Sequence, residues 1–336
     1  MSELHIKDET RQPKTPLEYA RLFFTGMAMG AADTVPGVSG GTMAFILGVY
    51  GDLLHAIKSF NLDAIRLALR FKIKELFGVI PWRFLVVLFA GIATSVLTLV
   101  RFIEPVVDQK LEPQFTFLFA TFMGLVLGSA VAIMPKVKRW SPVSIIMLII
   151  GAVAAFLIAI STPSQGSSSP IALFFSGMAA IIAMILPGIS GSSILLVLGQ
   201  YDVALGAVKN LEIVNMAALG LGCVVGLVIF SRILSWLLKT YEYPTIATLI
   251  GFVLGSLWAV WPWKEAVREG EEIVNTYNVA PNVASSDFFI AVLLIIFGFL
   301  LVNFIDHLAS GGNLVFKRIW RREQPDTPMV EEAQNV

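Results

Sequence analysis

The sequence predicts an all-α polytopic membrane protein made of two inverted-topology repeats, each a re-entrant helical hairpin followed by three transmembrane helices. Its 336 residues are 56% hydrophobic and only 14% charged, with a mean hydropathy of +0.78. Several apolar runs reach or approach the length of about 20 residues that crosses a hydrocarbon core. In addition, a polar, helix-breaking octapeptide occurs twice, as VPGVSGGT at 35–42 and as LPGISGSS at 186–193.

The elements follow in the same order in each half. Repeat 1 is expected over residues 17–160, with its hairpin at 22–50 and spans at about 84–102, 116–134 and 143–160. Repeat 2 is expected over residues 171–310, with its hairpin at 171–199 and spans at about 214–234, 245–261 and 288–305. Polar tails are expected at 1–16 and 311–336, and the first lacks the apolar stretch of a cleavable signal peptide.

The two halves match along most of their length, which indicates an internal duplication. Leu22–Gly41 aligns with Leu173–Ser192, and GLVLGSAVAIMP at 124–135 aligns with GFVLGSLWAVWP at 251–262. The matches keep their order, which chance similarity between glycine-rich helices does not explain. Paired glycines four residues apart, such as Gly26 and Gly30, would also let helices approach closely.

Helix length and charge decide how the octapeptide segments cross the membrane. Each half-helix, such as Leu22–Val35, is about 21 Å long and too short for a core of about 30 Å. Re-entrant hairpins leave three crossings per half and hence inverted repeats, whereas single broken crossings leave four and parallel repeats. The re-entrant arrangement places 19 of the 24 Lys and Arg residues on the cytoplasmic side, and the alternative divides them equally. The positive-inside rule therefore favours inverted repeats with both termini cytoplasmic.

Composition excludes several classes of function. Lys and Arg together number 24, as do Asp and Glu, so no nucleic-acid partner is expected. The three histidines (His5, His55 and His307) are scattered, and the single Cys223 cannot form an intramolecular disulfide. No catalytic triad order, His/Glu metal motif or Walker loop occurs. We therefore expect no enzymatic activity, metal or cofactor.

The octapeptides carry the candidate binding site. Non-helical backbone at membrane depth is tolerated only inside protein or along a wet cavity. The Pro-Gly pairs at Pro36, Gly37, Pro187 and Gly188 should break the helix there. The first turn of each returning half-helix would then present free backbone N–H groups and hydroxyls. The residues that contribute them are Ser39, Gly40, Gly41, Thr42, Ser190, Gly191, Ser192 and Ser193. Such donors suit an anion, particularly a phosphate, and two such tips match the plan of inverted-repeat transporters. The alternative is that Pro-Gly only forms a turn and the serines cap helices.

Three charged residues are further candidates. Arg101 and Arg232 occupy equivalent places near span ends, where an arginine pairs with a phosphate or, more commonly, snorkels to the headgroups. Asp33 precedes the first break in an otherwise uncharged helix, and its partner position is Met184. An intramembrane carboxylate is a candidate for coupling to protons or another ion. A plain helix cap or a structural partner for a cation is the alternative.

At these motifs the chain resembles the polyprenyl-phosphate transporter family, formerly a membrane domain of unknown function in bacteria and archaea. The resemblance lies in ADTVPGVSGGTMAFILGVYGDLL at 32–54 and LPGISGSSILLVLGQYD at 186–202, supported by GLVLGS and GFVLGS. It implies a multi-pass protein of a prokaryotic cell membrane that returns undecaprenyl phosphate from the outer to the cytoplasmic leaflet. The family's motif residues map onto Pro36, Gly37, Ser39, Gly40, Pro187, Gly188, Ser190 and Gly191.

Together, the residues and the resemblance predict an alternating-access flippase for carrier-lipid recycling. The phosphate head would be held at the two loops while the polyprenyl tail stays in the bilayer. Two other hypotheses remain: a secondary transporter of a small soluble anion, which the same loops could serve, and a non-transporting membrane scaffold.

Overall fold

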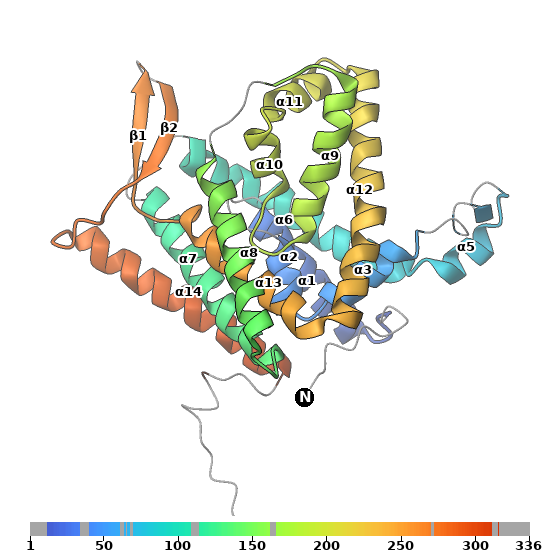
Figure 1. Ribbon diagram of the computed structural model, residues 1–336, viewed down its shortest axis with the longest axis horizontal. Coiled ribbons are helices and arrows are strands. Elements are labelled where there is room, and N and C mark those ends of the chain that lie inside the picture. Colours follow the sequence, from blue (N-terminus) through green and yellow to red (C-terminus); the bar gives the residue numbers. More distant parts are fainter. Residues whose placement is uncertain are drawn as a thin grey trace, which may run out of the picture.

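The computed structural model describes residues 12–33, 40–60, 64, 66–67, 70–108, 114–161, 166–269, 272–310 and 315. The helices of the first half are α1 (Pro16–Asp33), α2 (Gly40–Ile46), α3 (Tyr50–Lys58), α5 (Ile73–Val79), α6 (Trp82–Asp108), α7 (Gln114–Ile133) and α8 (Pro142–Ile160). Those of the second half are α9 (Pro170–Ile185), α10 (Gly191–Val197), α11 (Tyr201–Lys209), α12 (Ile213–Thr240), α13 (Glu242–Gly255) and α14 (Ser286–Ser310). Figure 1 shows their arrangement.

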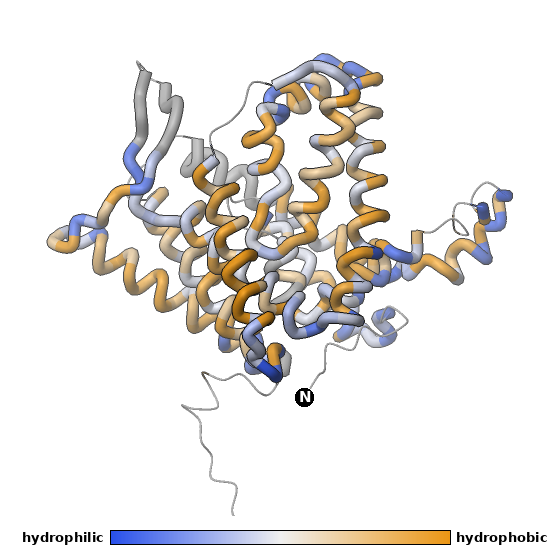
Figure 2. Tube along the Cα trace, in the orientation of Figure 1, coloured by the Kyte–Doolittle hydropathy of each residue, from blue (hydrophilic) through white to orange (hydrophobic). Residues whose placement is uncertain are grey.

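The helices have the length and surface of membrane-spanning elements. In the part of the chain that the structure describes, four helices are long and apolar enough to cross a membrane. The number of candidate spans rises to six if each of two bent helix pairs is counted as one span. Large apolar side chains such as Ile149 on α8 and Phe297 on α14 are more than half exposed. Figure 2 shows hydrophobic residues along the helices and hydrophilic ones gathered near their ends. The chain is therefore a multi-pass helical membrane protein, since helices satisfy their backbone polar groups internally.

The helices pack in pairs that repeat between the halves. The first hairpin helix packs on the next long helix in both halves, α1 on α6 and α9 on α12. The remaining long helices exchange partners between halves, α7 packing on α14 and α8 on α13. This pattern, in which every major pair has a counterpart, is what an internal duplication predicts.

Glycines at equivalent positions make these pairs possible. A side chain on Gly26 would strike the backbone carbonyl of Leu88, and one on Gly177 would strike that of Leu219. The α8–α13 and α14–α7 pairs are also equivalent. Gly151 of α8 lies against Thr248 of α13, and Gly298 of α14 lies against Thr121 of α7. The predicted close approach of helices through small residues is thus confirmed for these pairs.

The α-helix covers only part of the range at 245–261 where a span is predicted. Helix α13 ends at Gly255 after 14 residues and continues as a 3-10 turn over Ser256–Trp258. The Ser256 hydroxyl donates to the Val253 carbonyl, and the Trp261 indole N–H donates to the Val279 carbonyl. Both bonds lie where the α-helix gives way to the following segment. The short helix is buried at the centre of the protein, where Ile246 and Ile250 are fully covered.

A small sheet departs from the all-α prediction. Strands β1 (Lys264–Glu269) and β2 (Glu272–Asn278) form an antiparallel hairpin in the polar segment that precedes α14. It projects from one end of the helical bundle (Figure 1). The sequence prediction treated this segment as a loop, because its polar residues carry no span signal.

Candidate functional site

The second octapeptide forms a buried turn between two helices that lie side by side. Helix α9 ends at Ile185, and α10 returns along it after the turn (Figure 1). Pro187 and Gly188 are buried in this turn. Gly188 has a φ of 85°, and a side chain there would also strike the carbonyl oxygen of Phe252. Glycine is required at this position for both reasons, and the predicted helix break is observed.

The serines of this turn present their hydroxyls to one another. Ser190 occupies the N-cap position of α10, but its side chain makes no capping hydrogen bond. Its Oγ lies 2.8 Å from Oγ of Ser192, which is exposed, and Ser193 is half-buried. The alternative that Ser190 serves as a side-chain cap is therefore not what the structure shows. Two adjacent hydroxyls can both donate to one anion.

The first octapeptide is described only from Gly40 onward. Pro36, Gly37 and Ser39 lie outside the described residues, and Thr42 is placed only by its backbone in α2. At the start of α2, the backbone N–H of Gly40 donates to Oδ1 of Asp33 over 2.6 Å.

Gly40 is buried against the Asp33 side chain, and an added Cβ would fall on the carboxylate. This geometry favours the cap alternative for Asp33. Gly41, which follows on α2, is half-buried. A coupling role for Asp33 stays a prediction.

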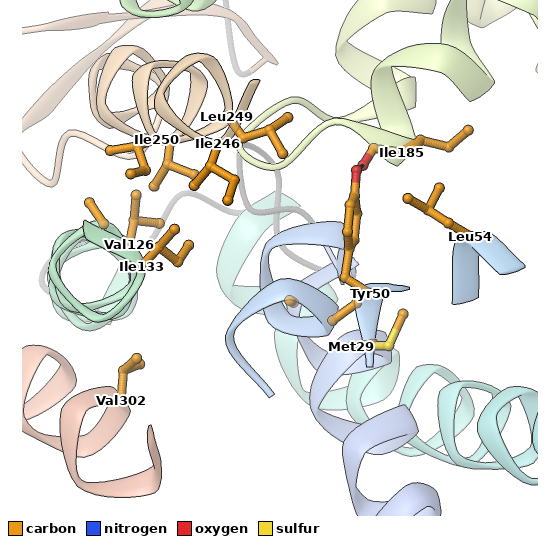
Figure 3. Close-up of a cluster of buried hydrophobic side chains, with 14 of the residues drawn as sticks. Met29, Tyr50, Leu54, Val126, Ile133, Ile185, Ile246, Leu249, Ile250 and Val302 are labelled. Atoms are coloured by element: carbon orange, nitrogen blue, oxygen red, sulfur yellow. Dashed lines mark hydrogen bonds between the residues drawn. The ribbon is translucent and has the colours of Figure 1, made fainter. Parts of the chain in front are cut away.

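A hydrogen bond joins the two hairpins. The Tyr50 hydroxyl, at the start of α3, donates to the backbone carbonyl of Ile185 over 3.0 Å, and the pair is buried (Figure 3). The last carbonyls of a helix have no intrahelical partner, so Tyr50 satisfies a group at the end of α9. The equivalent Tyr201 is 37% exposed, whereas Tyr50 is 2% exposed. Sequence reasoning missed this contact, although both tyrosines match between the repeats.

The open ends of the hairpins also differ. A cavity of about 220 Å³ lies at the open end of the first hairpin, where Arg21 of α1 faces Gly48 and Asp52. At the corresponding place in the second hairpin, Gly166 lies against the backbone of Gly199 and the side chain of Val203. A charged cavity thus lies at this end of the first hairpin, whereas Gly166 packs on the turn at Gly199 in the second.

Of the two predicted arginines, the structure describes the side chain of Arg232 alone. Arg232 is exposed on α12, whereas its neighbours Ser231 and Ser235 are buried. Exposure favours the snorkelling alternative for Arg232. Arg101 lies in α6, and its side chain is outside the described set. Among the described residues, no three His, Cys, Asp or Glu side chains form a group that could hold a metal ion.

These features define the class of the protein, a multi-pass helical membrane protein with a buried, hydroxyl-bearing helix break at its centre. The chain belongs to the VCA0040-like family, described as undecaprenyl phosphate translocase-like, whose model matches residues 29–276.

Two curated bacterial relatives carry the name polyprenyl-phosphate transporter. The protein from Vibrio cholerae serotype O1 is 41% identical over 251 residues, which are 75% of this chain and 80% of that protein. The protein from Staphylococcus aureus is 29% identical over 259 residues, which are 70% of this chain and 84% of that protein. No solved structure gives a significant match. The names of the family and its relatives describe transport rather than catalysis.

Proposed function

We propose that this protein is a flippase that moves polyprenyl phosphate, such as undecaprenyl phosphate, from the outer to the cytoplasmic leaflet of a prokaryotic cell membrane. The observation that carries the proposal is the buried Pro187–Gly188 break with its paired Ser190 and Ser192 hydroxyls. Its octapeptide is repeated at 35–42 in a chain of the translocase-like family. A charged headgroup is costly to move through hydrocarbon, and such a loop offers donors that offset the cost.

The phosphate head would bind the two hydroxyls of this loop and the backbone N–H groups of Gly191–Ser193. Helix α10 has only seven residues, so local hydrogen bonds rather than a long helix dipole supply the attraction. The second site would be the loop at Ser39–Thr42, and the polyprenyl tail would stay in the bilayer. Arg101 would receive the head near the membrane surface, whereas Arg232 would snorkel to the headgroups.

The hairpins would be re-entrant and the two halves inverted, with both termini cytoplasmic. The exchanged helix pairs and the distribution of Lys and Arg support this arrangement. The charged cavity at the end of the first hairpin would then face the cytoplasm, and the turn at Gly199 would face outward. The cavity supports a conformation that releases the head to the cytoplasmic side.

The contact between Tyr50 and Ile185 would be a contact of this conformation. In the opposite conformation the halves would exchange roles, and Tyr201 would become buried while Tyr50 is released. The position equivalent to Ile185 is Thr34, which lies outside the described residues. Protonation of Asp33 would weaken its bond to Gly40 and so couple the change to a proton.

The test is leaflet exchange of labelled undecaprenyl phosphate in proteoliposomes that contain the pure protein. We expect Ser190→Ala with Ser192→Ala to slow exchange about tenfold or more, because the loss of two hydrogen bonds to a charged group costs at least about 1.5 kcal/mol. The matched control is Ser168→Ala with Ser286→Ala, both exposed serines outside the loop. Equal exchange by both variants and the wild type would contradict the proposed site.

The same preparation distinguishes the other hypotheses. Uptake of free inorganic phosphate without lipid exchange would identify a transporter of soluble anions. Absence of both activities in folded protein would favour a scaffold.

A further inference from the structure

We propose that a groove between α7, α8 and α13 binds the isoprenoid chain of polyprenyl phosphate, with the Lys264 ammonium group near its α7 side to receive the phosphate. The proposal rests on the proposed function and deepens it, because the first isoprene units would lie on the protein rather than in bulk lipid.

The groove is apolar and has the size of a ligand site. Its volume is about 480 Å³, within the range of about 300–1,000 Å³ that small-molecule sites occupy. Met123 contributes from α7, Ala152 and Phe156 from α8, and Gly255, Trp258 and Trp261 from the end of α13 and the segment after it. Such a lining suits a hydrocarbon chain and offers little to a polar ligand.

Small residues make the floor and aromatic rings make one wall. A side chain on Gly255 would strike the backbone carbonyl of Ala152, so α8 and α13 are in backbone contact there. The rings of Phe156 and Trp258 meet edge to face, with centroids 5.5 Å apart. The floor is therefore fixed by backbone packing, and the wall is a pair of rigid rings.

The other half of the molecule carries different residues at the equivalent place. The positions that correspond to Ala152 and Phe156 are Phe299 and Asn303 on α14, which packs on α7 as α8 packs on α13. The Asn303 side chain is buried and donates to the carbonyl of Phe299 over 2.8 Å. A larger residue thus replaces Ala152, and a hydrogen-bonded amide replaces Phe156. The apolar lining of the groove is therefore specific to one half.

The groove adjoins the loop that carries the paired hydroxyls. Gly188 of that loop lies against Phe252 and Val253 of α13, and Ile189 packs with Ala155 of α8. These positions are within one helical turn of the groove residues Leu254 and Phe156. A chain in the groove would therefore lie beside the proposed phosphate loop.

A cation, Lys264, follows the groove residue Trp261 by three positions and lies near the α7 side of the groove. Nζ of Lys264 is 5.8 Å from the ring centroid of Phe119, one turn before Met123 on α7, and donates to Oδ1 of Asn278 over 2.7 Å. Burial lowers the pKa of Lys264 to about 8. The neighbouring Glu265 carboxylate accepts a hydrogen bond from the Tyr277 hydroxyl.

A partly desolvated ammonium gains from a phosphate partner. The tryptophans beside it suit the membrane interface, because the indole N–H of Trp261 has a backbone partner and its ring stays apolar. Charge near the groove and hydrocarbon along the floor together match an anionic lipid with a long apolar chain.

The test measures binding of undecaprenyl phosphate and of uncharged undecaprenol to the purified full-length protein, by native mass spectrometry in detergent. Ala152→Phe introduces the residue that the other half carries, and we expect it to weaken binding of both lipids about tenfold or more, because the ring takes the place of several methylene groups. The control is Ile150→Phe on the same helix, where the side chain is 51% exposed outside the groove lining. It should bind both lipids like the wild type.

A second variant separates the headgroup from the tail. Lys264→Gln keeps a donor for Asn278 and removes the charge, so we expect about tenfold weaker binding of undecaprenyl phosphate and unchanged binding of undecaprenol. Thermal unfolding in the same detergent checks that each variant is folded.

Wild-type affinity of folded Ala152→Phe for both lipids would overturn the proposal, as would displacement of the bound lipid by equimolar phosphatidylglycerol. If the serine variants still slow leaflet exchange in that case, the proposed function stands. Absence of both binding and exchange in the wild type would overturn the proposed function as well.

Discussion

The two hairpins carry nearly the same octapeptide in different surroundings. In the second hairpin, Ser190 and Ser192 face each other, and the position before the break is Met184. In the first hairpin, the equivalent Asp33 places a carboxylate on the backbone N–H of Gly40. A carboxylate at this position accepts the hydrogen bond that the Gly40 N–H could give to a ligand, and its charge repels an anion. The start of α2 therefore carries a negative charge where the start of α10 has none.

The same asymmetry appears where the hairpins meet. Tyr50 is buried and bonded to the end of α9, while Tyr201 is exposed. Repetition in sequence thus does not produce equal environments. For a transporter that alternates between two conformations, unequal repeats are useful, because exchange of their conformations yields the opposite state.

The largest effect should come from making the second hairpin like the first. Met184→Asp would place a carboxylate beside Gly191, because a Cβ added to Gly191 would lie 3.6 Å from Cβ of Met184. We expect leaflet exchange of undecaprenyl phosphate to fall about 100-fold or more, because like charges in such proximity cost several kcal/mol. Met184→Asn is the control for size and polarity. Exchange by Met184→Asp at the wild-type rate would show that this loop does not hold the phosphate.

The next effect concerns the contact between the hairpins. Tyr50→Phe would leave the Ile185 carbonyl without this donor and should lower stability by about 1–3 kcal/mol, measured by thermal unfolding in detergent. Tyr201→Phe is the matched control, since its exposed hydroxyl should contribute little. If both variants unfold alike, the structural asymmetry between the tyrosines has no energetic counterpart.

The smallest effect should come from the charge on Asp33. Asp33→Asn keeps an acceptor for the Gly40 N–H, so the protein should fold normally and exchange lipid within about threefold of the wild-type rate. Acceleration by a pH gradient, measured in the same proteoliposomes, should be lost if Asp33 couples transport to protons. Full retention of that acceleration would contradict coupling and leave Asp33 as a cap.

Much of the architecture follows from patterns that are local along the chain. Long apolar runs predict helices such as α7 and α8, because hydrocarbon admits only backbone whose polar groups are satisfied internally. The break at Pro187–Gly188 follows from a residue without an N–H donor and one that tolerates positive φ. The duplication also follows from the sequence alone, since it requires only comparison of the chain with itself.

Contacts between distant segments could not be predicted in this way. Nothing near Tyr50 in the sequence indicates that its hydroxyl bonds to Ile185, 135 positions away. The burial of α13 at Ile246, Leu249 and Ile250 likewise depends on helices from distant parts of the chain. Apolar composition alone cannot distinguish a buried helix from a lipid-facing one.

The sequence by itself determined that this is a duplicated, helical membrane protein with two broken-helix loops, because hydrophobic length, Pro-Gly breaks and repetition act locally. Only the tertiary structure decided that the Ser190 and Ser192 hydroxyls face each other, which tyrosine is buried, and where the apolar groove lies. Those differences depend on packing between helices of opposite halves, as where Ala152 meets Gly255 but Phe299 meets Gly128. Packing of this kind is set by the shape of the whole bundle and not by any one segment.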